Sequence, residues 1–227
     1  MHFLRKNPSR ASTPWFFGFI SRLSGFLFWL LYKNEVYFSE PLPKGGAILA
    51  ANHTSFFDPP IIGGTWPAEM HFLASDYLFR VPLLAPLIKA LNSHPVSRGS
   101  GDIAAFRLTA NLLKEGKKVA VFPEGTRSKD GKLQEFKRGV AKLSFLSHAA
   151  VIPIYIEGTD KIWGRSHKLP KLWGKTRIFY GKALYPETYK HMEKREAEEK
   201  LTYDLKESIL ELQHIAAKMT RTSTKLP

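Results

Sequence analysis

The sequence predicts an α/β domain in which a mixed, largely parallel sheet is flanked by helices, preceded by an amino-terminal amphipathic helical segment. Three observations support this prediction. The chain of 227 residues is long enough to bury a substantial core in one domain. Short apolar runs alternate with stretches of helical periodicity, and residues 1–34 have a composition of their own. With 44% hydrophobic and 24% charged residues, a disordered chain or a fibre is excluded.

Residues 1–34 hold five basic residues and no acidic one, around an apolar stretch at 15–32. At helical spacing the large apolar side chains of this stretch share one side, whereas Arg22 and the small residues fall mainly elsewhere. A charge at the centre of a membrane-spanning helix costs about 2.5–3.5 kcal/mol. We therefore expect a helix that lies in the bilayer interface and anchors the chain there. The alternatives are a core-packing helix and a signal peptide, although no small-residue cleavage pattern follows Leu31.

The rest of the chain, residues 35–227, is expected to form the main domain. Six short apolar runs predict strands, at 47–52, 70–74, 95–98, 119–122, 151–156 and 177–180. Helical periodicity predicts helices at 82–91, 102–115 and 136–149, with Asp102 and Gly116 as the start and stop of the second. A charged amphipathic helix is predicted at 189–217. Strands that alternate with helices imply a sheet covered on both faces.

The charge balance indicates anionic partners. Lys and Arg number 34 against 20 Asp and Glu, a formal net charge of +14. Such an excess attracts nucleic acid, a phospholipid surface or phosphorylated substrates, and charge alone does not choose among them. The absence of cysteine removes disulfides, thiolate metal sites and a thiol nucleophile. Because the histidines do not follow metal-ligand spacing either, we expect no metal.

Residues 50–60, Ala-Ala-Asn-His-Thr-Ser-Phe-Phe-Asp-Pro-Pro, hold the first candidate catalytic pair. His53 directly follows a predicted strand, and Asp58 precedes two prolines that turn the chain. Brought together by that turn, the Asp58 carboxylate would accept the Nδ1 proton of His53 and leave Nε2 as a base. The alternative is that Asp58 only caps the next helix and His53 is an ordinary loop histidine.

Polar residues also follow a second predicted strand, where residues 118–122 lead into Glu124, Gly125, Thr126 and Arg127. Open α/β sheets bind ligands at the carboxyl ends of their strands. Gly125 would let the backbone approach a ligand, and the planar guanidinium of Arg127 suits a phosphate monoester. Glu124 would hold that arginine or contact a substrate hydroxyl. The alternative is a surface turn.

Three blocks occur together: Asn-His-Thr-Ser-Phe-Phe-Asp at 52–58, Phe-Pro-Glu-Gly-Thr-Arg-Ser at 122–128 and Val-Ile-Pro-Ile at 151–154. In this order and separation they resemble the acyltransferase family that acylates glycerol phosphates and lysophospholipids, in particular its bacterial members that act on 1-acyl-glycerol-3-phosphate. A fourth family block maps to Val96 and Arg98.

The resemblance implies transfer of a fatty acyl group from an acyl thioester to the free hydroxyl of 1-acyl-glycerol-3-phosphate, which gives phosphatidic acid. The donor would be acyl-CoA or acyl carrier protein, used as a substrate, with no bound cofactor and no acyl-enzyme. His53 and Asp58 would be the catalytic residues. The substrate-binding residues would be Arg98, Glu124, Gly125, Thr126 and Arg127.

The segment 161–182 contains seven Lys or Arg and no acid. Its interleaved aromatic residues are Trp163, Trp173, Phe179 and Tyr180. Such a segment binds single-stranded nucleic acid or an anionic membrane, or is a solvated basic loop. Because an apolar amino-terminal segment is also present, we expect contact with a membrane and not with nucleic acid.

The sequence thus predicts a membrane anchor at 1–34 and an acyltransferase catalytic domain at 35–227. We expect a peripheral or monotopic protein on the cytoplasmic face of the cell membrane. Its expected partners are lysophosphatidic acid, an acyl thioester, the membrane surface and acyl carrier protein. Two alternatives stay open: another lysophospholipid acceptor, and a non-enzymatic basic module that binds lipid or nucleic acid. Such a module has no need of His53 paired with Asp58.

Overall fold

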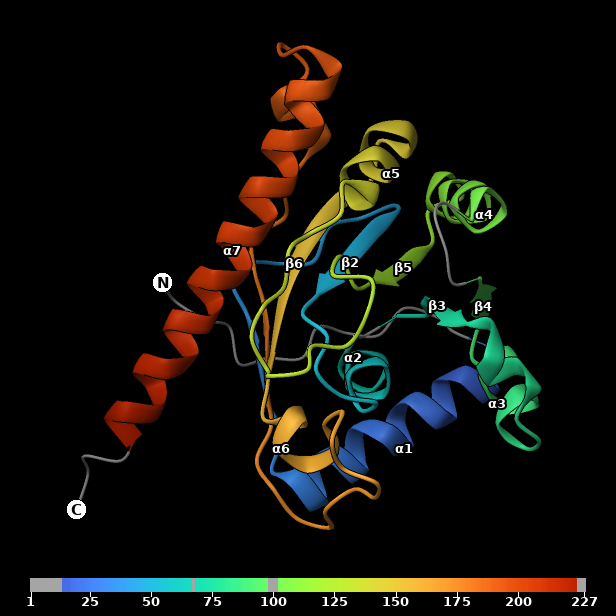
Figure 1. Cartoon of the computed structure of the whole chain (residues 1–227), viewed down its shortest axis with the longest axis vertical. Coiled ribbons are helices and arrows are strands. Elements are labelled where there is room, and N and C mark those ends of the chain that lie inside the picture. Colours follow the sequence, from blue (N-terminus) through green and yellow to red (C-terminus); the bar gives the residue numbers. More distant parts are fainter. Residues whose placement is uncertain (1–13, 67, 98–101, 224–227) are drawn as a thin grey trace.

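The computed structural model describes residues 14–66, 68–97 and 102–223, with side chains as far as Thr220. Its strands form one seven-stranded sheet in the order β1-β7-β6-β2-β5-β3-β4 (Figure 1). The strands are β1 (Glu35–Phe38), β2 (Ala47–Ala51), β3 (His71–Ser75), β4 (Ser93–Val96), β5 (Lys118–Val121), β6 (Ala150–Glu157) and β7 (Arg177–Tyr180). The helices are α1 (Trp15–Tyr32), α2 (Asp58–Thr65), α3 (Leu84–Ala90), α4 (Ile103–Lys114), α5 (Gly139–Ser147), α6 (Thr159–Trp163) and α7 (Lys194–Ser223), with 3-10 turns η1 (Asp76–Arg80) and η2 (Pro186–Tyr189).

The sheet is mixed and largely parallel, as the sequence predicts. Strands β6, β2, β5, β3 and β4 run parallel to one another. Strand β7 is antiparallel to β6 and parallel to the edge strand β1. The carboxyl ends of β2, β5 and β6 therefore lie at one edge of the sheet. The short edge strand β1 and the helix α6 were not expected from the sequence. Five residues are too few for helical periodicity to identify α6.

The strands bury both of their faces, and β2 shows why. Ala47, Leu49 and Ala51 belong to the core cluster that includes side chains of α1, α2 and α6. Ile48 and Ala50 belong to the cluster on the other face, which includes side chains of α4, α5 and α7. Successive side chains of a strand point to opposite faces, so a run of five apolar residues fills two cores. Figure 1 shows α1, α2 and α6 gathered at one end of the molecule and α5 at the other.

Helix α1 packs on the domain through one side, and its other side is exposed. Phe17, Phe28 and Tyr32 are buried, and the Ser21 hydroxyl donates a hydrogen bond to the carbonyl of Gly63 in α2. The opposite side of α1 is exposed and mainly apolar, and comprises Trp15, Phe19, Leu23, Phe26, Leu27, Trp29 and Leu30. Arg22 is exposed on the same side, three residues after Phe19 and four before Phe26, which corrects the expectation that it falls elsewhere. Among the described residues, α1 is the one helix long and apolar enough to cross a bilayer, with a mean hydropathy of 1.3.

Two glycines set the distance between α1 and α2. A Cβ atom on Gly64 would lie 2.7 Å from the Gly25 nitrogen, so we expect Gly64→Ala to force the helices apart and lower the free energy of unfolding. Overpacking of this kind costs about 1–3 kcal/mol. Urea unfolding monitored by circular dichroism measures the loss. Gly139→Ala in α5 is the control, because a Cβ there meets nothing within 4 Å; equal effects of the two changes would contradict the prediction.

Candidate active site

The loop after β2 is tied to the neighbouring strand before it reaches its polar side chains. Asn52 is buried, its side-chain amide donates to the Ile156 carbonyl at 2.9 Å, and its oxygen accepts from the Ile156 amide at 2.7 Å. These two bonds continue the pairing of β2 with β6 through a side chain. His53 therefore leaves the sheet from a fixed point.

His53 and Asp58 form a hydrogen-bonded pair, with 2.8 Å between His53 Nδ1 and Asp58 Oδ2. Asp58 is fully buried, and its Oδ2 also accepts from the amides of Thr54 and Ser55 at 2.7 and 2.8 Å. Its Oδ1 accepts from the Thr159 hydroxyl at 2.6 Å. A carboxylate surrounded by donors requires that His53 Nδ1 carry the proton, which leaves Nε2 as the unprotonated nitrogen of the neutral ring.

Asp58 does not cap the helix that it begins. Phe57, the residue before helix α2, forms no side-chain cap, and the Asp58 carboxylate faces back onto the loop of residues 53–55. The helix-cap alternative is thus wrong, and the carboxylate serves the histidine loop. The His53 ring is 18% exposed and stacks on Phe122, with 3.9 Å between ring centroids and 16° between planes.

Glu124 braces the backbone of His53. It follows β5, which pairs with β2, so the two strand ends lie side by side. Its Oε1 accepts from the His53 amide at 2.7 Å, and its Oε2 accepts from the Gln134 amide at 3.0 Å. Burial raises the pKa of the Glu124 carboxyl, and these two hydrogen bonds partly oppose that rise. Ser128, four residues further on, donates its amide to the His53 carbonyl at 2.7 Å.

The turn after Glu124 places Gly125, Thr126 and Arg127 beside this loop. Gly125 has a φ of +74°, and its amide donates to the Phe122 carbonyl at 2.9 Å, so a residue with a side chain would be strained there. Thr126 is exposed. The guanidinium carbon of Arg127 lies 3.5 Å from the centre of the Phe56 ring, a cation–π contact. The turn therefore presents Arg127 next to the histidine loop. Glu124, at its start, bonds to the His53 amide, a role that the sequence did not predict.

The remaining predicted site residue, Arg98, lies outside the described residues. Val96 ends β4, which runs parallel to β3. The carboxyl end of β4 therefore lies at the same edge of the sheet as those of β2 and β5.

The sequence interpretation missed several residues that shape the site. Thr159 donates a hydrogen bond to Asp58 although the two residues are 101 positions apart, and no local sequence pattern predicts that contact. Phe122 was within reach of prediction, because it directly follows β5, and β5 pairs with the strand that precedes His53. Lys137 lies against the turn: a Cβ atom on Gly125 would come within 2.9 Å of the Lys137 amine.

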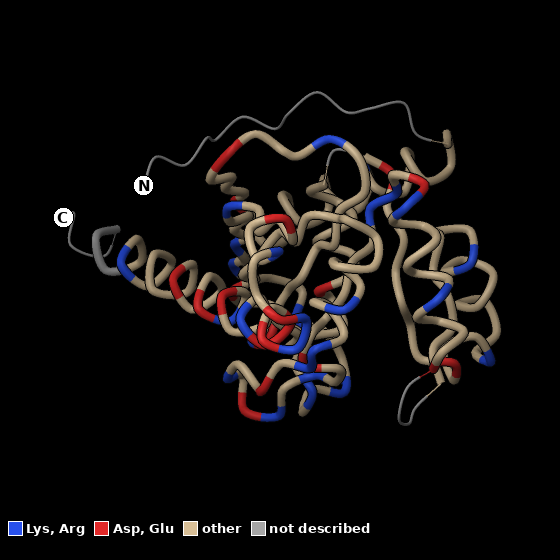
Figure 2. Tube along the Cα trace, turned by 90° about the horizontal axis from the view of Figure 1, so that it is seen from above, with Lys and Arg blue, Asp and Glu red and all other residues tan. Residues whose placement is uncertain are grey.

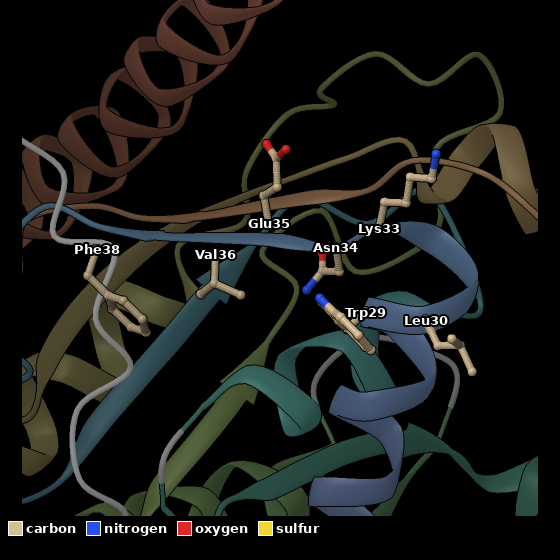
Figure 3. Close-up of a pocket in the computed structure, with 7 residues that line it drawn as sticks. All are labelled: Trp29, Leu30, Lys33, Asn34, Glu35, Val36 and Phe38. Atoms are coloured by element: carbon tan, nitrogen blue, oxygen red, sulfur yellow. The ribbon is translucent and has the colours of Figure 1, made fainter.

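A cavity of about 580 Å³ lies away from these residues, between the end of α1 and β1. Its lining residues are Trp29, Leu30, Lys33, Asn34, Glu35, Val36 and Phe38 (Figure 3). None of them belongs to the histidine loop or to the turn after β5, so the chemistry of the side chains, and not cavity size, marks the candidate site. Within the part of the chain that the structure describes, no three His, Cys, Asp or Glu side chains are grouped to hold a metal ion.

Comparison with known proteins agrees with the geometry. Residues 33–157 match the family model described as Acyltransferase. The chain is 28% identical over 182 residues to the 1-acyl-sn-glycerol-3-phosphate acyltransferase of Bacillus subtilis. This alignment covers 79% of this chain and 88% of that protein. It is 29% identical to the chloroplast 1-acyl-sn-glycerol-3-phosphate acyltransferase of Arabidopsis thaliana, over 68% of this chain and 44% of that protein.

A solved structure is similar along most of the chain. It is the crystal structure of the 1-acyl-sn-glycerophosphate acyltransferase PlsC from Thermotoga maritima, with a TM-score of 0.67 and 28% sequence identity. The match covers 84% of this chain and 78% of that one. The match therefore extends far beyond the two blocks of site residues.

Proposed function

The chain belongs to the acyltransferase family, and we propose that it transfers a fatty acyl group from an acyl thioester to the free hydroxyl of 1-acyl-glycerol-3-phosphate, forming phosphatidic acid in phospholipid biosynthesis. The observation that supports this most directly is the His53–Asp58 pair, held at 2.8 Å beside the turn that bears Arg127. A binding module would gain nothing from burying a carboxylate to orient a histidine.

In the proposed reaction His53 is the general base. Asp58 occupies Nδ1, so Nε2 takes the proton of the acceptor hydroxyl as the oxygen attacks the thioester carbonyl carbon. The carbon–sulfur bond of the resulting tetrahedral intermediate then breaks, and the departing sulfur takes the proton from the imidazolium. Asp58, fully buried, stabilises that imidazolium while it exists. The acyl group passes directly from donor to acceptor, and the donor, acyl-CoA or acyl carrier protein, is a substrate and not a bound cofactor.

The acceptor phosphate is assigned to Arg127, with Arg98 as its expected partner. The planar guanidinium of Arg127 is kept in place by the face of the Phe56 ring, three residues from His53. The backbone at Arg127 is fixed too, because Arg165 donates to its carbonyl at 3.0 Å. A positioned arginine fork suits a phosphate monoester, the head group of lysophosphatidic acid. Glu124, Gly125 and Thr126 form the turn that presents it.

We expect Arg127→Ala to lower kcat/KM for lysophosphatidic acid about 10- to 100-fold, chiefly through the acceptor KM. A hydrogen bond to a charged group contributes about 1.5–3 kcal/mol, which corresponds to that range. Steady-state kinetics with varied acceptor at saturating acyl-CoA measures the effect. Lys129→Ala, an exposed basic residue two positions on, is the control; an equal loss in both variants would remove the phosphate assignment.

Thioester consumption by the purified full-length protein in detergent micelles tests the proposed function. The acceptors to compare are lysophosphatidic acid, lysophosphatidylcholine, lysophosphatidylglycerol and glycerol phosphate. We expect turnover with lysophosphatidic acid and phosphatidic acid as the product. Turnover with a different acceptor alone would keep the reaction and reassign the substrate. No turnover with any acceptor, from a protein with a cooperative unfolding transition, would contradict the proposal.

We further propose that the protein works on the cytoplasmic face of the cell membrane as a peripheral or monotopic protein, with residues 1–34 as its anchor and 35–227 as the catalytic domain. The support is the exposed apolar side of α1, which carries Trp15 and Trp29 with 81% and 62% of their surface exposed. Because α1 also buries Phe17, Phe28 and Tyr32 in the core, single substitutions on its outer side test anchoring better than deletion of the helix.

A further inference from the structure

The segment that follows α6, residues 164–175, exposes more apolar surface than a solvated loop should. Within five positions it carries Leu169, Leu172 and Trp173, with 79%, 71% and 68% of their surface exposed. Contiguous large apolar side chains on a soluble surface mark an interaction site. We call residues 164–175 the basic loop, because its charged residues are Arg165, Lys168, Lys171 and Lys175.

The basic loop is fixed to the carboxyl-terminal end of α1. The Tyr32 hydroxyl donates to the Lys171 carbonyl at 3.0 Å, and the Gly174 amide donates to the Leu31 carbonyl at 3.4 Å. Directly after the loop, the Thr176 amide donates to the Tyr32 carbonyl at 3.0 Å. The apolar tip of the loop, which consists of Leu169, Leu172 and Trp173, is therefore held near the carboxyl-terminal end of α1, and the segment after α6 lies along that end in Figure 1.

The other end of the basic loop is fixed to the candidate active site. The Ser55 hydroxyl donates to the Trp163 carbonyl at 2.8 Å, directly before the loop, and Arg165 donates to the Arg127 carbonyl at 3.0 Å. The Trp163 ring also lies 5.0 Å from the Phe56 ring, on which Arg127 stacks. The loop thus joins α1 to the elements that present the base and the proposed phosphate ligand.

The charge of this region matches an anionic surface. Seven Lys or Arg and no acid occur at 161–182. Along α7, by contrast, acidic and basic residues are interspersed (Figure 2). Arg165, Lys168 and Lys171 are exposed and flank the apolar tip. Basic residues around exposed tryptophan and leucine are typical of a segment that sits at the level of lipid phosphates and inserts its apolar side chains below them.

We propose that the basic loop is a second membrane-contact element, which inserts Leu169, Leu172 and Trp173 into the interface of an anionic phospholipid bilayer beside α1. The inference rests on the proposed function in one respect, namely that the acceptor is a membrane lipid. With contacts at α1 and at the loop, the bilayer would fix the orientation of the enzyme as well as hold it. An acidic carrier protein would also be attracted by the charge, but it has no use for an exposed apolar tip next to the carboxyl-terminal end of the anchoring helix α1.

Sedimentation of the full-length protein with vesicles, without substrate, tests the proposal. The triple variant Leu169→Ser/Leu172→Ser/Trp173→Ser is expected to bind vesicles of phosphatidylcholine and phosphatidylglycerol about tenfold or more weakly than the unchanged chain. The matched control is Ile103→Ser/Leu146→Ser/Tyr203→Ser, whose targets are 65%, 49% and 59% exposed on α4, α5 and α7. The control is expected to bind like the unchanged chain.

A charge variant gives a second, independent measurement that does not alter the apolar tip. Lys168→Ala/Lys171→Ala is expected to weaken binding to phosphatidylglycerol-containing vesicles about tenfold or more and to leave binding to pure phosphatidylcholine unchanged, since each basic residue near an anionic surface contributes about a fivefold factor. Lys190→Ala/Lys194→Ala, at two exposed positions near the start of α7, is the control.

Unchanged vesicle binding in the triple variant, with its unfolding transition retained, would overturn the proposal. The proposal would also be overturned if the triple variant kept its vesicle binding and lost turnover with acyl carrier protein as donor but not with acyl-CoA. The loop would then be a binding site for the carrier protein. Failure of the proposed function has a different signature: no turnover by the unchanged chain, whatever its vesicle binding.

Discussion

His53→Asn is expected to lower kcat by about 10²–10⁴-fold, the usual contribution of a general base, while the protein keeps its fold. The asparagine side chain is short enough to stay within the loop. Its amide nitrogen can replace His53 Nδ1, which lies 2.8 Å from Asp58 Oδ2 in the unchanged chain, as the donor to Asp58. What the substitution removes is Nε2. The loss therefore reports the base itself and not a collapsed loop, which is the ambiguity of an alanine at this position.

Single-turnover and steady-state rates with saturating acyl-CoA and lysophosphatidic acid measure the effect, alongside thermal unfolding. We expect His53→Asn to lower the free energy of unfolding slightly, because the stack of the His53 ring on Phe122 is lost. Such aromatic contacts contribute about 0.5–1.5 kcal/mol. His191→Asn, at an exposed position far along the chain, is the control and should leave kcat unchanged. Turnover by His53→Asn at the rate of the unchanged chain would remove His53 from the mechanism.

The interior of the sheet was predictable from sequence because its strands are buried on both faces. Runs such as residues 47–51 and 151–156 contain almost no polar side chain, and turns delimit them. Strand β4 was harder: it begins at Ser93 and not at residue 95, because an edge strand next to solvent tolerates Ser93 and His94. A pattern search for apolar runs starts too late on such a strand.

The site was predictable to the extent that its members follow strand ends. His53 and Glu124 follow β2 and β5, and parallel pairing brings those ends together. Which atoms meet was not predictable, because Glu124 bonds to the backbone of His53 and not to the side chain of Arg127 as one expectation had it. Contacts such as Thr159 with Asp58 depend on how α6 closes over the loop, and no local spacing encodes that.

The same limit applies to α1. Helical spacing separates its large apolar side chains from Ser21 and Gly25 and so predicts two different sides. It does not say which side faces protein. The structure answers this through close approach: a Cβ on Gly25 would lie 2.6 Å from the Gly64 carbonyl oxygen, so the small residues face α2. Most of the large apolar side chains are exposed, whereas Phe17, Phe28 and Tyr32 are buried. A long apolar side that the domain leaves uncovered is what makes the membrane proposals testable.

Asp58 offers the sharpest separation of catalysis from stability. Asp58→Asn is expected to retain the fold, because its amide oxygen can accept from Thr54 and Ser55 as Oδ2 does, while its nitrogen donates to the Thr159 hydroxyl. The negative charge is lost, however, and with it the stabilisation of the imidazolium that forms on His53 during transfer. We expect kcat to fall about 10²–10⁴-fold, with the unfolding transition nearly unchanged.

Asp58→Ala should behave differently, because it leaves the amides of Thr54 and Ser55 as buried donors with no acceptor. Removing one member of a buried charged network costs about 3–5 kcal/mol, so this variant should lose stability together with activity. Asp130→Asn is the control for both measurements, since Asp130 is exposed and accepts from the nearby residues Ser128, Lys132 and Gln134. If Asp58→Asn turned over at the unchanged rate, the carboxylate would have only a structural role, and the charge that the fold buries beside His53 would need another explanation.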